Sequence, residues 1–207
     1  MRGRESTPGA IALPEAAFLF ADIAGFTAYT EIHGDAPAAE LAWRLRLGVE
    51  GQLGDDAHVV KTLGDAVMAR IAEPAEAAAA GLRIVARALP GPGDPDIRVG
   101  VHCGPAVERM GDFFGTAVNV AARVCALAAP GEVLVTRAVA EPARRLGLAL
   151  EDRGERALRN VAAPVRLAAV TADPRDGRGR LRVIPDCRHG VPERELVAGM
   201  ATNGGDR

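Results

Sequence analysis

FLFADIAGFT, which occupies residues 18–27, is the stretch of sequence that decides the fold. Its apolar run from Phe18 to Ala21 predicts a buried strand, and that strand ends at Asp22. Gly25 supplies a small turn, and a helical pattern of leucines follows it. Functional groups are often displayed in loops at strand ends on a rigid scaffold. The stretch therefore predicts a strand, a turn and a helix that present a carboxylate at their junction.

The rest of the chain continues this alternation of strands and helices. Apolar residues flank Gly64-Asp65 and predict a hairpin that turns at these two residues. The pattern predicts a helix over 74–89, a strand over 97–102 that stops at Gly104-Pro105, a loop over 111–115 and a helix over 118–127. A strand at 132–135, a short helix at 138–146 and closing strands at 148–150 and 165–170 follow. We predict an α+β fold, a ferredoxin-like βαββαβ sandwich with appended C-terminal elements.

Length and composition limit the class of protein. The 207 residues fit one domain, which we expect over residues 15–172, with a flexible leader at 1–14 and a disordered tail at 173–207 that is rich in Arg, Asp, Gly and Pro. The net charge of −2 argues against a nucleic-acid partner. No run approaches the ~20 apolar residues of a membrane-spanning helix, and the three cysteines lack disulfide or zinc spacing. We expect a soluble cytoplasmic protein without a nucleic-acid or membrane partner.

Two carboxylates stand at predicted strand ends, Asp22 after the first strand and Asp65 in the hairpin. If they meet at adjacent strand ends, they would bind hard divalent cations of the kind that phosphoryl-transfer enzymes use. The backbone N–H groups of Gly25, Phe26 and Thr27 begin a predicted helix and would face a polyphosphate. The alternative interpretation is structural: Asp22 caps the helix and Asp65 is an ordinary turn aspartate.

Lys61 is the only lysine among 25 basic residues. Its survival is either chance or the sign of a position that needs a compact ammonium group. Rival nucleotide motifs are absent, because Val60 stands where a Walker loop has glycine, and Asp96 where a dinucleotide fingerprint has its third glycine. Ser6 is the only serine, which excludes a serine hydrolase.

Two aromatic residues have structural interpretations. We expect His102, which lies between Val101 and Cys103 in a predicted strand, to be a core histidine with a satisfied hydrogen bond and not a metal ligand. Trp43 follows the helical pattern of Leu47, and we expect it in core or dimer packing.

Three motifs, taken together and in order, resemble those of the class III nucleotidyl cyclase catalytic domain. They are FADIAGFT at 20–27, KTLGD at 61–65 and DFFGTAVNVAAR at 112–123. The resemblance runs from about residue 15 to about residue 172, and the order and spacing of the three motifs make it specific. The short segment between Gly104 and Asp112 is similar to that of the bacterial subclass with a reduced dimerisation arm.

The resemblance implies a metal site and a base-reading pair. Asp22, Asp65 and the backbone carbonyl of Ile23 match the ligands of two divalent cations, Mg²⁺ or Mn²⁺. Lys61 and Asp112 match the pair that reads the purine, in which the lysine donates to adenine N1 and the aspartate accepts from the exocyclic amine. Guanylyl cyclases typically carry Glu and Cys there, so the resemblance implies ATP as substrate, with Gly25, Phe26 and Thr27 near its phosphates.

Further residues match groups that handle the ribose and the phosphates. Asn119 matches the residue that orients the ribose, and Arg123 matches the one that stabilises charge in the transition state. A spacing of four places both on one face of a helix. Arg159 matches a basic residue that grips the terminal phosphates. Asn160 departs from the family, which usually has glycine there, although Asn tolerates left-handed backbone better than most residues.

Two functions are open at this stage. The first is an adenylyl cyclase of signal transduction that converts ATP to 3′,5′-cyclic AMP and pyrophosphate in a homodimer, with composite sites at the interface. The alternative is a catalytically silent cyclase-homology module that dimerises and binds nucleotide as a regulator. Silent relatives typically lose a metal aspartate or the Asn/Arg pair, and this chain retains all of them, which favours the enzyme. A diguanylate cyclase would need a GGDEF-like hairpin, which Leu63–Val67 does not match.

Overall fold

The computed structural model describes residues 10–89, 91 and 93–171. The strands are β1 (Ala10–Ile23), β2 (Ala57–Leu63), β3 (Ala66–Ile71), β4 (Ile97–Arg109), β5 (Asp112–Phe114), β6 (Val133–Thr136), β7 (Ala149–Arg156) and β8 (Val165–Thr171). The helices are α1 (Phe26–His33), α2 (Asp35–Glu50), α3 (Pro74–Arg87), α4 (Thr116–Leu127) and α5 (Arg137–Arg145). None of the helices in these ranges is long and apolar enough to cross a membrane.

One sheet runs through the molecule in the strand order β2-β3-β1-β4-β6-β8-β7, and β5 pairs with β4 off this path. Its first four strands are antiparallel neighbours, with β1 between β3 and β4. This is the sheet of a βαββαβ unit whose first crossover consists of α1 and α2 and whose second consists of α3. The predicted α+β class with appended C-terminal strands is confirmed.

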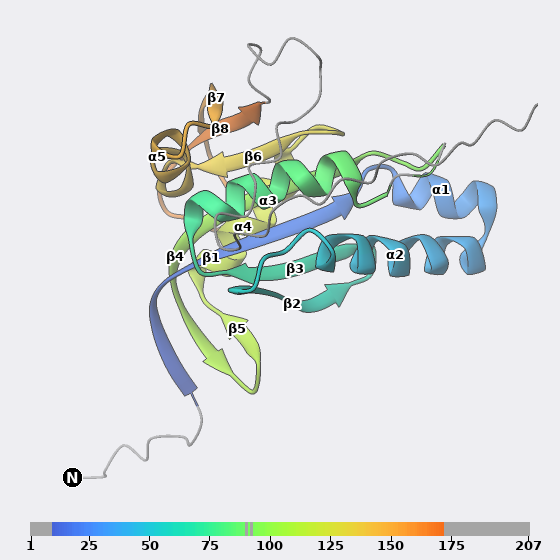
Figure 1. Cartoon of the computed structure of the whole chain (residues 1–207), viewed down its shortest axis with the longest axis horizontal. Helices are drawn as coiled ribbons and strands as arrows, with labels where there is room; N and C mark the ends of the chain where they lie inside the picture. The colour runs from blue at the N-terminus through green and yellow to red at the C-terminus, as the bar shows by residue number, and fades with distance from the viewer. Residues whose placement is uncertain (1–9, 90, 92, 172–207) are drawn as a thin grey trace, which may run out of the picture.

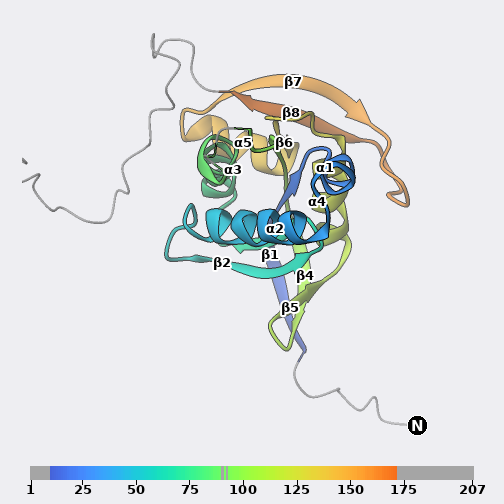
Figure 2. The same ribbon diagram turned by 90° about the vertical axis from the view of Figure 1, so that its right-hand side faces the viewer.

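Helices cover both faces of the sheet. Alternate residues of β1 point to opposite sides, and both sets are apolar and buried. Leu19 and Ile23 pack in one core with the buried faces of α2, α3 and α5. Phe18 and Phe20 pack in a second core with α4 and with Phe113 of β5. Figure 2 shows α3 and α4 on opposite sides of the sheet.

The first strand begins earlier than expected, which corrects the boundary of the leader at residue 14. Residues 10–13 pair with residues 106–109 of β4, and pairing resumes at Ala16 opposite Gly104. Pro14 and Pro105 both fall in this interruption, where neither has to donate a ladder hydrogen bond. The prolines that predicted breaks therefore mark an irregularity inside two longer paired strands. Residues 1–9 and the predicted tail at 173–207 lie outside the described residues.

A short hairpin replaces the loop expected at 111–115. Met110 and Gly111 adopt positive φ values of 54° and 76°, and the chain returns along β4 as β5. Two consecutive residues with positive φ match the twist of a two-residue hairpin. This hairpin and the first half of β1 project from the body of the sheet (Figure 1).

Helix α4 lies unusually close to β4 because Gly100 has no side chain. A Cβ atom at this position would stand 2.0 Å from the backbone nitrogen of Cys125. The glycine thus lets the helix backbone rest directly on the strand.

His102 and Trp43 have different outcomes. His102 Nδ1 lies 2.8 Å from the hydroxyl of the buried Thr136, and burial lowers the pKa of His102 to about 4. It is the satisfied core histidine that was expected. Trp43 is 54% exposed, so the core alternative is wrong for it and packing in a dimer stays a prediction; the buried face of α2 carries Leu41 and Leu45 instead.

Candidate active site

Asp22 and Asp65 meet at one end of the sheet. The register pairs Asp22 with Ala66, the residue that follows Asp65, and the β2–β3 hairpin turns at Gly64-Asp65 as predicted. Burial and the neighbouring Asp22 carboxylate raise the pKa of Asp65 above its ordinary value. Two carboxylates this close create a site that favours a cation.

Arg98 is a residue that sequence reasoning missed. It lies directly opposite Asp22 on β4, and both its Nε, at 2.7 Å, and its Nη2 donate to the same oxygen, Asp22 Oδ2. Arg98 therefore holds the Asp22 carboxylate through one of its two oxygens. The available signal was the arginine near the start of an otherwise apolar strand, but its partner depends on the strand register.

A β-bulge determines where Lys61 points. Val59 pairs with Ala69 and Lys61 pairs with Met68, so Val60 is an extra residue in β2. Met68 is in turn opposite Phe20, which places Lys61 on the same face of the sheet as Phe20 and Asp22. Without the extra residue, alternation would turn Lys61 toward the other face.

Lys61 and Asp112 form an ion pair. The Lys61 Nζ atom lies 2.7 Å from each carboxylate oxygen of Asp112, and it stands 5.8 Å from the centre of the Phe114 ring. The hydrogen bond from Lys61 lowers the pKa of Asp112, and the backbone N–H of Phe113 adds to the effect. Both side chains are about one-third exposed, so a planar ligand can approach them.

The turn after β1 presents an uncapped helix N-terminus. Gly25 has a φ of 74°, and α1 begins at Phe26 without a hydrogen bond from any capping side chain. The first N–H groups of a helix have no partners inside the helix. Phe26 and Thr27 therefore offer donors for an anion, next to Ile23, the last residue of β1.

Asn119 and Arg123 lie on the outer side of α4. The face of α4 that contacts the sheet carries Ala117, Ala121 and Cys125, whereas the Arg123 guanidinium donates to the Asn119 backbone carbonyl at 3.2 Å. Within the described part of the chain, no hydrogen bond or ion pair joins either side chain to Asp22 or Asp65. Within the described residues, Asn119 and Arg123 are thus not paired with the carboxylates of their own chain.

Arg159 is exposed in the turn between β7 and β8. The neighbouring Leu158 and Val161 pack against α4, so the turn belongs to the same side of the molecule as Asn119 and Arg123. Asn160 has a φ of 57°, which shows that the position requires left-handed backbone and that Asn adopts it.

The donor set fits divalent cations bound with a polyphosphate. Within the described ranges, no group of three or more His, Cys, Asp or Glu side chains gathers around one point. Asp22 and Asp65 alone would leave much of a cation's coordination shell open, which suits ions that keep waters and take substrate phosphates as ligands. The fold and this site define the class of protein: an α+β domain that carries two neighbouring carboxylates at one end of its sheet, a donor pair that fits a divalent cation.

Comparison with known proteins agrees with that class. Residues 11–169 match the family described as the adenylate and guanylate cyclase catalytic domain, and the chain belongs to this family. A pH-sensitive adenylate cyclase from Mycobacterium tuberculosis is 38% identical over 158 residues, and an adenylate cyclase from Streptomyces griseus is 34% identical over 139 residues. These matches cover 73% and 67% of this chain but only 39% and 35% of the relatives, so the chain spans less than half of their length.

Solved structures share the fold. The adenylyl cyclase CyaB from P. aeruginosa has a TM-score of 0.69 at 19% identity, and the match covers 81% of this chain and 98% of that one. An adenylate/guanylate cyclase/hydrolase from Silicibacter pomeroyi has a TM-score of 0.65 at 29% identity and covers 79% of this chain and 99% of its own.

Proposed function

We propose that this chain is an adenylyl cyclase that converts ATP to 3′,5′-cyclic AMP and pyrophosphate for signal transduction. The observation that carries the proposal is the placement of Asp22, Asp65 and the Lys61–Asp112 pair on one face of the sheet, beside the open N-terminus of α1. One end of this surface suits a polyphosphate with its cations, and the other suits a base with both a donor and an acceptor.

The base would be chosen by Lys61 and Asp112. Adenine presents an acceptor at N1 beside a donor amine, which complements an ammonium beside a carboxylate. In the structure the two groups satisfy each other at 2.7 Å. A base must therefore replace that ion pair with hydrogen bonds of its own, and a guanine edge, with its donor and acceptor reversed, would leave both groups poorly matched.

The triphosphate would lie at the strand ends. Asp22, Asp65 and the Ile23 carbonyl would hold two divalent cations, Mg²⁺ or Mn²⁺, which when bound make the ribose 3′-hydroxyl more acidic and neutralise the phosphates. Arg98 keeps Asp22 oriented by binding Oδ2 only. The N–H groups at Phe26 and Thr27 face the phosphates, and the exposed Arg159 supplies a further positive charge.

The reaction is an in-line attack of the ribose 3′-oxygen on the α-phosphorus, with pyrophosphate as the leaving group. Asn119 would orient the ribose, and Arg123 would stabilise the charge that develops on the α-phosphate. Both side chains point away from the sheet of their own chain. We infer that they serve the carboxylates of a second copy, so that the active protein is a homodimer with composite sites.

The β4–β5 hairpin and the first half of β1, which together project from the sheet, support such an association. Their exposed apolar side chains are Ile11, Val107, Met110 and Phe114, of which Met110 is 95% exposed. Apolar side chains gathered on one projection are typical of an interaction surface.

The test is a cyclic-nucleotide assay of the purified chain with ATP and with GTP, each with Mg²⁺ and Mn²⁺. Asp65→Ala should abolish cyclic AMP formation while the thermal transition persists. A mixture of Asp65→Ala and Asn119→Ala chains should recover activity, because each mixed dimer keeps one complete site. Absence of product from the unaltered chain at high concentration would favour the silent regulatory module. Activity in each single variant equal to that of the unaltered chain would refute the composite site.

A further inference from the structure

A pocket of about 330 Å³ lies between α5 and the β7–β8 hairpin, away from the groups described above. Its floor is apolar and consists of Ala140, Leu167 and Ala168. Its rim carries three arginines and two carboxylates: Arg137, Glu141 and Arg144 from one face of α5, Asp152 from β7 and Arg166 from β8. This volume falls at the lower end of the range for small-molecule sites, roughly 300–1,000 Å³.

The charges of this rim do not balance. Arg137 pairs with Glu141 at 2.7 Å, and Arg166 pairs with Asp152 at 2.6 Å. No hydrogen bond or ion pair of the Arg144 guanidinium is found among the described residues. Arg144 nevertheless lies within electrostatic range of both carboxylates. It helps to lower the pKa of Glu141, after Arg137 and Arg145, and the pKa of Asp152, after Arg166 and the Gly154 N–H. The pocket therefore holds one unpaired guanidinium beside two paired ones.

The two ion pairs are weakly held. Arg137 is 74% exposed and Arg166 is 58% exposed, and pairs at such positions typically contribute about 0–1 kcal/mol. An oxyanion that binds in the pocket can thus accept hydrogen bonds from Arg137 and Arg166 with little loss of free energy from the two ion pairs. Around the pocket, the segment from Arg137 to Arg166 carries seven arginines and four acidic residues, although the whole chain has a net charge of −2.

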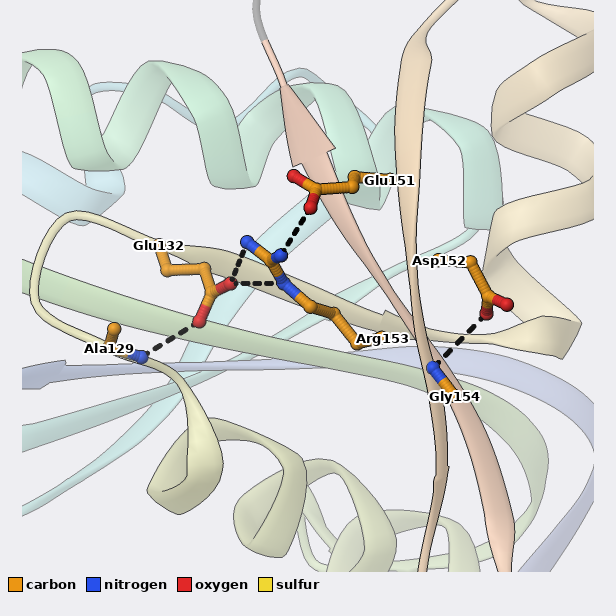
Figure 3. Close-up of polar contacts among 6 residues, drawn as sticks. All are labelled: Ala129, Glu132, Glu151, Asp152, Arg153 and Gly154. Carbon is orange, nitrogen blue, oxygen red and sulfur yellow. Dashed lines mark hydrogen bonds and ion pairs between the residues drawn. The ribbon is translucent and has the colours of Figure 1, made fainter.

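The environment of Arg144 differs from that of the nearby Arg153, whose guanidinium is paired with two carboxylates. Arg153, the residue after Asp152, binds both Glu132 and Glu151, and Glu132 also accepts from the Ala129 N–H (Figure 3). A bulge in β7 between Asp152 and Gly154 turns the Arg153 and Asp152 side chains to different sides of the strand. Asp152 Oδ1 accepts a hydrogen bond from the Gly154 N–H (Figure 3). Among the residues that the structure describes, Arg144 has no such partners.

We propose that this pocket binds the phosphate group of a small phosphorylated molecule, with Arg144 as the primary ligand and Arg137 and Arg166 at its sides. A guanidinium fork matches phosphate oxygens in a bidentate geometry. The apolar floor leaves room for a small organic group attached to the phosphate.

The experiment measures binding of inorganic phosphate and of ribose 5-phosphate to the full chain by calorimetry without divalent cations, which the cyclase site needs to hold phosphates. Arg144→Ala should weaken binding at least about tenfold. Arg145→Ala removes the same charge from the adjacent exposed position, which does not line the pocket, and should change affinity less than about twofold. Ribose 5-phosphate binding more tightly than inorganic phosphate would identify a phosphate ester as the ligand.

Two outcomes would overturn the proposal. One is equal weakening by Arg144→Ala and Arg145→Ala, which would indicate a diffuse charge effect. The other is loss of phosphate binding in Arg123→Ala but not in Arg144→Ala, which would place the phosphate on α4. Thermal transitions of all variants, recorded in parallel, show that each chain is folded.

Discussion

Replacement of Gly100 by alanine tests the close contact that positions α4. The added Cβ would stand 2.0 Å from Cys125 N and 2.4 Å from Cys125 Cα, whereas ordinary contacts of a Cβ atom begin at 3.4 Å. Both contacting atoms are backbone atoms of a helix, so no side-chain rotation relieves the overlap. Helix α4 must move away from β4 by about 1 Å or more.

This movement has two consequences of different size. Overpacking of this kind costs about 1–3 kcal/mol, which lowers the Tm of a chain of this size by roughly 2–12 °C. Asn119 and Arg123 move with the helix, and a displacement of about 1 Å in a catalytic group can reduce kcat by roughly a hundredfold. We therefore expect a modest loss of stability together with a severe loss of activity.

The assay compares cyclic AMP formation well below the Tm of each variant with the Tm itself. Gly54→Ala is the matched control, because a Cβ at that position meets nothing within 4 Å, and it should change the free energy of unfolding by less than about 0.5 kcal/mol. The reasoning is refuted if Gly100→Ala has the Tm and activity of Gly54→Ala. A lowered Tm with unchanged kcat would refute the link between this contact and the position of α4.

Three further outcomes are expected. Lys61→Glu combined with Asp112→Cys should shift the ratio of kcat/KM for ATP and GTP toward GTP by about tenfold or more, because it reverses the donor and acceptor; an unchanged ratio means that these residues do not read the base. Burial holds the pKa of His102 at about 4, below the unfolded value near 6.5, so the unfolded chain takes up its proton first and stability falls as pH drops through this window. In urea unfolding, the free energy of unfolding should decrease between pH 7 and pH 5 by about 2 kcal/mol less in His102→Gln than in the unaltered chain. The same decrease in both chains would contradict the assignment. Asn160, with a φ of 57°, should tolerate glycine, whereas Asn160→Ala should lower stability by about 1 kcal/mol; equal Tm values for the two variants would contradict a strained position.

Much of the candidate site could be predicted from the sequence because its elements are local. The strand that ends at Asp22, the turn at Gly25 and the hairpin at Gly64-Asp65 depend on short apolar runs and on residues with special backbone freedom. The spacing of Asn119 and Arg123 likewise required only the period of a helix. Their order along the chain was enough to indicate the family.

The tertiary structure alone decided which of these groups face one another. Alternation read from the sequence would place Lys61 opposite to its true face, because the extra residue Val60 is visible only once β2 is paired with β3. Pro14 likewise lies at an irregularity in the pairing of β1 with β4, which the sequence does not show. Arg98 binds Asp22, which is 76 residues away in the sequence. Register is set by the whole sheet and by the hydrophobic clusters that pack on it, and one residue of slip moves a side chain to the other face. The chain therefore encodes its functional groups locally, while their assembly depends on strand pairing between distant segments.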